Sequence, residues 1–327
     1  MKGHCDFFQS PRGFPYIPGG DICGIVEECD DYNQDSTKTR TTTKRKFRKG
    51  DVVLGMFQLP RPLDGLAEYI CVPESHVVEL APKQTNPMEA ACLTSSDLTA
   101  YHAAKGFVKP NDRVLVLGAS GGVGPFLVQL AKLVQGASFV CATTKDATLL
   151  NSLTSRDDTG ATTGPVIVDR VIDYTMQNWW DVKEFQEQPF DVIIDLAVGL
   201  EGWKQSRKVL KSGWRGGTYV AVTSDEPLME IHSWSDTFKF MMKLQGRMLW
   251  THLWRFGRPK YFWLSGLDIK PGAFSELVEL VETKRLKIVL DPASSSDFTI
   301  DAVKNAFKVM EGRRAHGKVV IHISSMK

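Results

Sequence analysis

The chain has 327 residues, of which 43% are hydrophobic and 24% are charged, and its formal net charge at pH 7 is +2. This composition is typical of a soluble globular protein long enough for two domains, and the small net charge gives no argument for a nucleic-acid partner. The one local concentration of basic residues, at positions 38–49, follows the acidic and polar residues 30–37 without aromatic interleaving. We interpret it as a flexible surface loop.

The N-terminal part of the chain has the pattern of a β-rich, barrel-like domain. Short apolar stretches separated by turn residues predict strands over residues 21–26, 51–55 and 65–72. From residue 86 onward, helical patterns alternate with apolar strands at residues 114–117, 138–142, 170–172, 192–195 and 219–223. This alternation predicts an α/β domain with a parallel, doubly wound sheet.

The C-terminal part continues the alternation of helices and strands. We expect a helix over residues 274–283, a strand over 287–290, a helix over 299–311 and a strand over 318–323. The last strands are expected to return to the β-rich domain.

The most informative motif is a glycine loop between a strand and a helix. An apolar strand ends at Gly118, and Gly121 and Gly124 follow before the amphipathic stretch 125–131. We interpret Gly118 as a tight turn, Gly121 as the point where the backbone approaches a pyrophosphate, and Gly124 as the point where the helix packs against the sheet. The free N–H groups at the helix start would face the phosphate.

The end of the following strand predicts which dinucleotide binds. The stretch 138–145 ends in Thr143, Thr144 and Lys145 and contains no acidic residue. A site selective for NAD usually places a carboxylate here for the ribose 2′-hydroxyl, whereas hydroxyls followed by a cation suit a 2′-phosphate. NADPH is therefore favoured over NADH. The alternative is that Lys145 only begins a solvated helix.

Six cysteines, at positions 5, 23, 29, 71, 92 and 141, show no Cys-x-x-Cys pair, which favours reduced thiols in an intracellular compartment. No stretch approaches about 20 unbroken apolar residues, so no integral membrane span is expected. The aromatic residues of the segment 238–263 could line a pocket, contact a partner subunit or touch a membrane surface, although ordinary core and subunit packing is their commoner use. They are Trp250, Trp254, Phe256, Tyr261, Phe262 and Trp263.

Several motifs in consistent order resemble the zinc-independent branch of the medium-chain dehydrogenase/reductase superfamily, the quinone oxidoreductases and related enone reductases. Within that branch, the mitochondrial reticulon-interacting and chloroplast-envelope types look most similar. The motifs lie at residues 14–26, 49–53, 65–69, 98–101, 118–124, 171–174, 190–195 and 316–320. The resemblance implies a GroES-like domain over residues 1–92, a Rossmann domain over 93–286, a return to the first domain over 287–327, and NADPH in the cleft between them.

The resemblance also assigns cofactor roles to individual residues. It implies that Ser120, Gly121, Gly122 and Val123 bind the pyrophosphate, and that Tyr174 joins Lys145 at the 2′-phosphate. It places Thr99 on the phosphate and nicotinamide side, and the segment beginning at Ala197 along the nicotinamide. The simpler alternatives are that Tyr174 is a surface residue ending a strand and that the Thr99 hydroxyl bonds within its own helix turn.

No metal is expected. The zinc alcohol dehydrogenases of the superfamily carry Gly-His-Glu where this chain has Gly19-Gly20-Asp21, and no four-cysteine lobe is present. Catalytic zinc needs three protein ligands, and the spacing of His4, Asp21 and Cys23 does not favour such a set. The protein would then assist hydride transfer by proximity and a polarising hydrogen bond.

The proton donor is left unassigned. Related enone reductases often carry a tyrosine shortly before the Pro-Gly-Gly segment, and His4, Cys5 or solvent could replace it here. We interpret His4 as an exposed residue near a frayed terminus and Cys5 as unreactive.

Relatives usually have on the order of fifty further residues before Met1, including the first strands of the GroES-like domain. The sequence is therefore interpreted as N-terminally shortened, either by truncation or as a natural variant. Two functional classes remain open. The first is an NADPH-dependent quinone or α,β-unsaturated carbonyl reductase, in a family whose members commonly form homo-oligomers. The second is a catalytically impaired nucleotide-binding or interaction protein.

Overall fold

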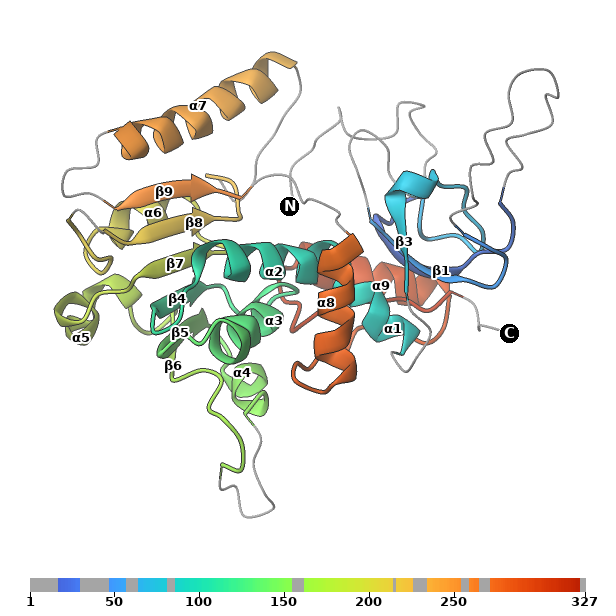
Figure 1. Cartoon of the computed structure of the whole chain (residues 1–327), viewed down its shortest axis with the longest axis horizontal. Helices are drawn as coiled ribbons and strands as arrows, with labels where there is room; N and C mark the ends of the chain where they lie inside the picture. The colour runs from blue at the N-terminus through green and yellow to red at the C-terminus, as the bar shows by residue number, and fades with distance from the viewer. Residues whose placement is uncertain are drawn as a thin grey trace.

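The computed structural model describes residues 17–29, 47–56, 64–80, 86–154, 162–213, 216–225, 234–253, 259–264 and 271–323. These residues form a six-stranded sheet and a separate three-stranded sheet, joined by α2 and α8 and by the C-terminal segment (Figure 1). Residues 30–46 of the expected surface loop (30–49) lie outside the described part of the chain, as do His4, Cys5, Trp254 and Phe256. The end of that loop is described, and there Phe47 is buried, at 2% exposed, rather than on the surface.

The large sheet is parallel throughout, and its strand order is β6-β5-β4-β7-β8-β9. Its strands are β4 (Arg113–Leu117), β5 (Phe139–Thr144), β6 (Arg170–Asp173), β7 (Val192–Asp195), β8 (Thr218–Ala221) and β9 (Lys260–Trp263). Numbered along the sheet this is the order 3-2-1-4-5-6 of a doubly wound dinucleotide-binding fold. The predicted α/β domain with a Rossmann sheet is confirmed.

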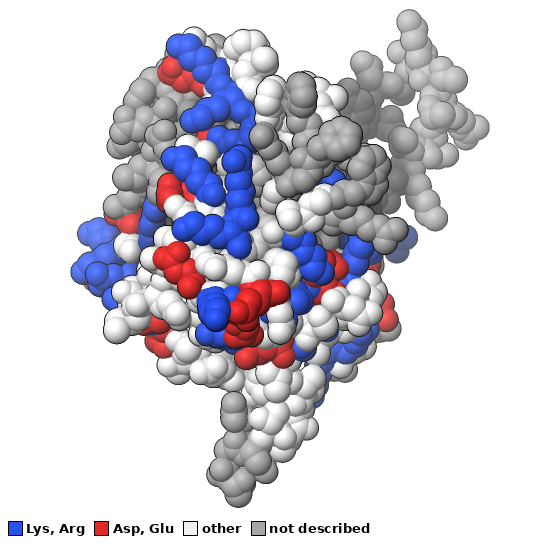
Figure 2. Space-filling view, turned by 90° about the vertical axis from the view of Figure 1, so that its left-hand side faces the viewer, with Lys and Arg blue, Asp and Glu red and all other residues white. Residues whose placement is uncertain are grey.

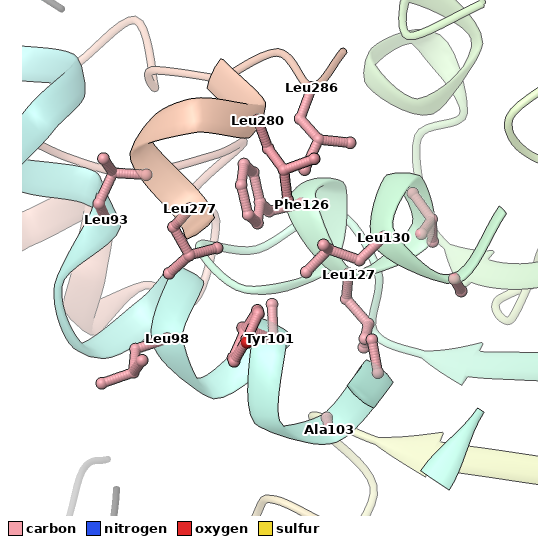
Figure 3. Packing of buried hydrophobic residues seen from close by; sticks show 14 of the residues in the cluster. Leu93, Leu98, Tyr101, Ala103, Phe126, Leu127, Leu130, Leu277, Leu280 and Leu286 are labelled. Atoms are coloured by element: carbon pink, nitrogen blue, oxygen red, sulfur yellow. The ribbon is translucent and has the colours of Figure 1, made fainter. Parts of the chain in front are cut away.

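Helices cover both faces of this sheet because its central strands are apolar on both sides. One core joins Val114, Val116 and Ile194 to α2 (Ser95–Phe107), α3 (Gly124–Gln129) and α8 (Pro271–Glu282). Figure 3 shows Leu277 and Leu280 of α8 directed toward Phe126 and Leu130. A π-helical turn, Leu130–Val134, continues α3.

The opposite core joins Leu115, Leu117 and Ile193 to α5 (Lys183–Glu187), α6 (Leu200–Ser206) and α7 (Trp234–Leu253). The alternation of neighbouring residues between the two cores is the period of two expected of a strand. Shorter elements are α1 (Pro87–Ala90), α4 (Thr148–Ser152) and three 3-10 turns, Glu74–His76, Ala91–Leu93 and Trp179–Asp181.

The small sheet is antiparallel, in the order β1-β2-β3. Its strands are β1 (Asp21–Ile25), β2 (Val52–Met56) and β3 (Val77–Glu79). The first two were expected and β3 was not. The strand predicted over residues 65–72 is wrong, because only Gly65 and Leu66 donate backbone bonds, to Gly19 and Pro18, before the chain bends.

The C-terminal helix α9 (Ile300–Glu311) was predicted, and the Thr299 hydroxyl caps it by accepting from Ala302 N–H at 3.2 Å. The strands predicted over residues 287–290 and 318–323 are wrong. Only isolated parallel bridges form there, between Leu290 and Lys318 and between Ser295 and Ile321. The segment after α9 nevertheless returns to β1, because Lys318 forms an ion pair with Asp21.

The aromatic segment divides between α7, at the outer edge of the molecule, and β9 (Figure 1). Tyr261 of β9 is 1% exposed and stacks on Tyr219, and the Trp263 ring lies 5.6 Å from that of Phe240. These residues serve core packing, the commoner use considered above. Trp250 on α7 is 54% exposed. Within the described ranges, no helix has the length and apolar character of a membrane span.

Figure 2 shows Lys and Arg side chains gathered in a stripe, with acidic side chains among them. This view faces the side of the molecule on which the strands of the large sheet begin. Ion pairs at these strand starts join Lys211 to Asp191 and Arg170 to Glu184. The basic charge on this side is therefore partly neutralised by neighbouring carboxylates.

Candidate functional site

The glycine loop follows β4 at the centre of the large sheet. Gly118 has φ +77°, and a Cβ built there would lie 2.5 Å from the Cβ of Ala197, so only glycine fits without strain. A Cβ at Gly124 would lie 2.2 Å from the carbonyl oxygen of Ala119. Gly118 thus has the turn conformation expected of it. The reason expected for Gly124 differs from the one observed, because the close approach is to the loop's own backbone at Ala119 and not to the sheet.

The middle of the loop is open. A Cβ built at Gly121 meets no atom within 4 Å, and one at Gly122 meets its nearest neighbour, the Ser96 hydroxyl oxygen, at 3.6 Å. The carbonyl oxygen of Ser120 accepts a hydrogen bond from Gly317 N–H at 3.0 Å, which fixes the loop to the C-terminal segment. This geometry leaves backbone accessible where a pyrophosphate is expected.

Thr143, at the end of β5, belongs to the framework of the loop. Its side chain is buried, and its hydroxyl oxygen accepts a hydrogen bond from Gly118 N–H at 2.9 Å. Its carbonyl oxygen accepts a second from Ala119 N–H at 2.9 Å. Thr143 therefore holds the loop in place.

Lys145 and Tyr174 leave the sheet side by side, because Thr144 of β5 pairs with Asp173 of β6. Lys145 is exposed, and 55% of Tyr174 is exposed. Hydrogen bonds from Thr175, and in smaller part the charge of Lys145, hold the pKa of Asp173 below its usual value. The ammonium of Lys145 therefore contributes positive potential at this edge of the sheet.

The turn after β7 is built around Asp195, which is fully buried. Its Oδ1 accepts from Ala197 N–H at 2.9 Å and Val198 N–H at 2.7 Å, and its Oδ2 accepts from Gly199 N–H and the Tyr219 hydroxyl, both at 2.6 Å. Burial raises the pKa of Asp195, and these hydrogen bonds oppose that shift. Asp195 thus fixes the segment expected to line the nicotinamide.

Sequence reasoning placed Asp195 in a motif but assigned it no role. The signal available in the sequence was a carboxylate that ends an apolar strand four residues before Gly199. In the structure Gly199 has φ +76° and no room for a Cβ beside the Ser224 and Asp225 carbonyls. The partner hydroxyl of Tyr219 is 24 positions away and could not be found by local pattern.

Thr99 lies on the first turns of α2. Its hydroxyl donates to the Ser95 carbonyl oxygen at 2.5 Å, which is the alternative considered for it. The oxygen still has a lone pair for another donor, so the assignment to the cofactor stays a prediction.

A second cluster, which sequence reasoning missed, lies at the start of α2 beside the glycine loop. Lys318 Nζ donates to Asp21 Oδ2 and to the Ser96 hydroxyl oxygen, both at 2.8 Å, and the Ser95 hydroxyl donates to Asp21 Oδ2 at 2.5 Å. Asp97 is 3% exposed, and burial raises its pKa to about 8. The motifs at residues 19–21 and 316–318 were noticed, but nothing in the sequence shows that they meet.

The structure thus brings most of the predicted site together. Gly118 contacts Thr143 and Ala197, the loop reaches α2 through Gly122, and Lys145 stands with Tyr174 at the neighbouring strand ends. These residues share the carboxyl edge of the parallel strands, and β4 and β7 flank the point where the strand order reverses, which is where such folds bind ligands.

Comparison with known proteins identifies the family. A family described as "Zinc-binding dehydrogenase" matches residues 168–321. The mouse mitochondrial NAD(P)H oxidoreductase RTN4IP1 is 30% identical over 321 residues, which cover 95% of this chain and 71% of that protein. The chain belongs to the medium-chain dehydrogenase/reductase family. A tomato 2-methylene-furan-3-one reductase is 32% identical, over 97% of this chain and 66% of the relative.

Solved structures of the medium-chain family agree with the fold. A quinone oxidoreductase from Coxiella burnetii superposes with a TM-score of 0.67 at 22% identity, over 96% of this chain and 81% of that one. A mycobacterial protein solved with NADPH gives a TM-score of 0.65 at 22% identity, over 96% and 84%. These likenesses confirm the two-domain fold of a Rossmann sheet with a GroES-like partner. The domain limits themselves stay predictions.

The chain spans about two thirds of the length of several medium-chain relatives, 66% of the tomato reductase and of an Arabidopsis chloroplastic NADPH-dependent alkenal/one oxidoreductase. The relatives carry mitochondrial and chloroplastic names.

Although the matching family is named for zinc, no group of three or more His, Cys, Asp or Glu is suitably placed for a metal among the described residues. Asp21 is bonded to Lys318, and burial raises the pKa of Cys23 to about 11, so neither is poised as a zinc ligand. Zinc independence stays a prediction.

Proposed function

We propose that the protein is an NADPH-dependent, zinc-independent oxidoreductase that transfers hydride to a quinone or an α,β-unsaturated carbonyl compound. The observation that carries this proposal is the meeting of two turns at the centre of the sheet, the glycine loop after β4 and the Asp195 turn after β7, where Gly118 contacts Ala197. The names of the relatives, which include quinone oxidoreductases and enone reductases, support the substrate class.

The cofactor-binding part of the proposal follows from the donors at this edge. Pyrophosphate would lie on the backbone of Ser120 to Val123, where Gly121 leaves open space. A 2′-phosphate would lie at Lys145 and Tyr174, which favours NADPH over NADH because the cation gains a partner only when that group is present. Relatives are named for NAD(P)H or NADPH, which supports a nicotinamide dinucleotide.

When bound, NADPH supplies the hydride for the electron-poor acceptor. The residues of the chain contribute by position: the Asp195 turn fixes Ala197 to Gly199 along the nicotinamide, and Thr143 fixes the loop that holds the phosphates. A preformed turn of this kind needs no reorganisation on binding, which favours a productive orientation of the reacting atoms. The organelle names of the relatives favour an intracellular location.

The test is NADPH consumption by the purified protein with a panel of quinones and enones, in parallel with NADH and with zinc analysis of the same preparation. Turnover that prefers NADPH in zinc-free protein is the expected result. NADPH binding without turnover would overturn the proposed activity and leave a nucleotide-binding protein. Turnover that depends on bound zinc would overturn the zinc independence.

A further inference from the structure

Lys318 places a mostly buried ammonium between the two sheets. Its side chain is 17% exposed, and its partner Asp21, at the start of β1, is 20% exposed. The preceding residue, Gly317, is hydrogen-bonded to the Ser120 carbonyl of the glycine loop at 3.0 Å. The lysine is therefore attached through its own backbone to the loop on which a pyrophosphate is expected.

The side chain of Lys318 also borders the open part of that loop. A Cβ built at Gly122 would have three nearest neighbours: the Ser96 hydroxyl oxygen at 3.6 Å, the Gly317 carbonyl oxygen at 3.7 Å and Lys318 Cδ at 3.8 Å. Lys318 Nζ in turn lies 2.8 Å from the Ser96 hydroxyl. Because residue 122 is glycine, a space remains beside the loop. The Ser96 hydroxyl borders this space and is hydrogen-bonded to the Lys318 ammonium.

Donors outnumber acceptors around this space. The Ser96 oxygen accepts from Lys318, so the Ser96 proton is available to a further acceptor, and Lys318 has a third N–H. The first N–H groups of α2, at Ser95 and Ser96, have no acceptor inside the helix and add positive potential. Asp21 supplies one compensating charge. Asp97 supplies none near neutral pH, because burial keeps its carboxyl protonated below about pH 8.

We propose that Lys318, held by Asp21 and Ser96, binds the pyrophosphate of the dinucleotide beside Gly122. This inference rests on the proposed function, because it requires the pyrophosphate to lie on the glycine loop. A diphosphate bridge supplies the acceptor oxygens that the Ser96 hydroxyl and the third Lys318 proton lack. Such charge-assisted hydrogen bonds are about twice as strong as neutral ones.

A purely structural role for the same ion pair makes a different prediction. If Lys318 only joins β1 to the C-terminal segment, Asp21→Asn and Lys318→Gln break one contact and should impair cofactor binding alike. If Lys318 binds phosphate, Lys318→Gln should lower NADPH affinity strongly, whereas Asp21→Asn keeps an oxygen that can accept from Lys318 and should lower the affinity less.

The chain offers a matched control. Lys132 and Asp169 form an ion pair of the same length, 2.8 Å, with similar exposures of 18% and 25%, at the strand starts far from the carboxyl edge. Affinity would be measured for wild type, Lys318→Gln, Asp21→Asn and Lys132→Gln by NADPH fluorescence and by competition with ADP-ribose and AMP, after folding is checked by circular dichroism.

The expected result is a loss of about tenfold or more for NADPH and ADP-ribose in Lys318→Gln, corresponding to at least about 1.4 kcal/mol. AMP, which lacks the pyrophosphate, should change little, and Lys132→Gln should match wild type. Equal losses in Lys318→Gln and Asp21→Asn would overturn the inference, as would unchanged NADPH affinity in Lys318→Gln, and both would leave the proposed function standing. Wild-type protein that binds no NADPH would instead overturn the proposed function.

Discussion

Replacing Asp195 by Asn tests whether the turn after β7 depends on a buried carboxylate. The amide keeps one oxygen for the Ala197 and Val198 N–H groups but sets an NH₂ group against the two donors on Oδ2, Gly199 N–H and the Tyr219 hydroxyl. The hydroxyl can turn toward the Gly199 carbonyl oxygen, which lies 3.3 Å away. Gly199 N–H then remains buried without an acceptor.

The magnitude follows from these losses. One unpaired buried N–H costs about 1–3 kcal/mol, and two bonds that change from charged to neutral acceptors lose about 1 kcal/mol each. Burial raises the pKa of Asp195, so a neutral residue recovers part of the desolvation cost. We therefore expect Asp195→Asn to lower the free energy of unfolding by about 3 kcal/mol, toward the lower end of the sum.

Urea denaturation followed by tryptophan fluorescence would measure this change at pH 7. Tyr219→Phe is the matched control, since it removes one of the four hydrogen bonds and keeps the carboxylate, with an expected loss of about 1.5 kcal/mol. NADPH affinity should fall more in Asp195→Asn than in Tyr219→Phe because the turn itself is disturbed. An Asp195→Asn protein as stable as Tyr219→Phe would refute this account of the turn.

The remaining predictions concern the glycines, the cation and the buried acid of the site. Gly121→Val should abolish NADPH binding with little change in thermal stability, since the new Cβ occupies open space; retained NADPH affinity would exclude the pyrophosphate role of Gly121. Gly124→Ala should instead destabilise the fold, because the new Cβ would lie 2.2 Å from a backbone oxygen. Lys145→Ala should weaken NADPH affinity by about 10- to 100-fold, equivalent to about 1.5–3 kcal/mol, and leave NADH affinity unchanged. Equal losses of affinity for both cofactors in binding titrations would remove the 2′-phosphate assignment. Because burial raises the pKa of Asp97 to about 8 in the folded protein, the folded state holds its proton more tightly than the unfolded state, and stability should fall as pH rises from about 5 to about 8. Asp97→Asn should flatten that part of the profile in urea titrations, and an unchanged slope would contradict the buried acid.

The central strands could be predicted from the sequence because they are apolar on both faces. Continuous runs such as those of β4 and β7 identify buried parallel strands whatever their partners are. β9 was not expected, because only one of its three aromatic side chains, Tyr261, is buried, and these aromatic residues continue the aromatic pattern of the preceding segment. The expected strands at residues 287–290 and 318–323 failed for the opposite reason. They are apolar enough for a strand, but each reaches a neighbour at isolated bridges only.

The site was predictable where its chemistry is local and unpredictable where it depends on distant contacts. Glycine spacing and the residues ending β5 predict the loop and the cation within one strand-helix-strand unit, from β4 through α3 to β5. The Asp195 turn and the Lys318 cluster require partners 24 and 297 positions away, which no local pattern contains. Both pairs place a carboxylate, fully buried in Asp195 and 20% exposed in Asp21, behind the surface expected to receive the cofactor.

These two carboxylates do opposite work in the proposed mode of binding. The Asp195 carboxylate accepts four hydrogen bonds, three of them from N–H groups of its own turn. Those N–H groups are not available to a ligand, so the turn would contact the nicotinamide without donating hydrogen bonds to it. Among the described residues, the Asp21 carboxylate accepts from Ser95 and Lys318, which holds an ammonium beside the loop while donors on Ser96 and Lys318 stay available. A hydride donor needs an uncharged, rigid surface at the ring and a cationic one at the phosphates. In the proposed mode of binding, the distribution of donors between the two carboxylates supplies that asymmetry.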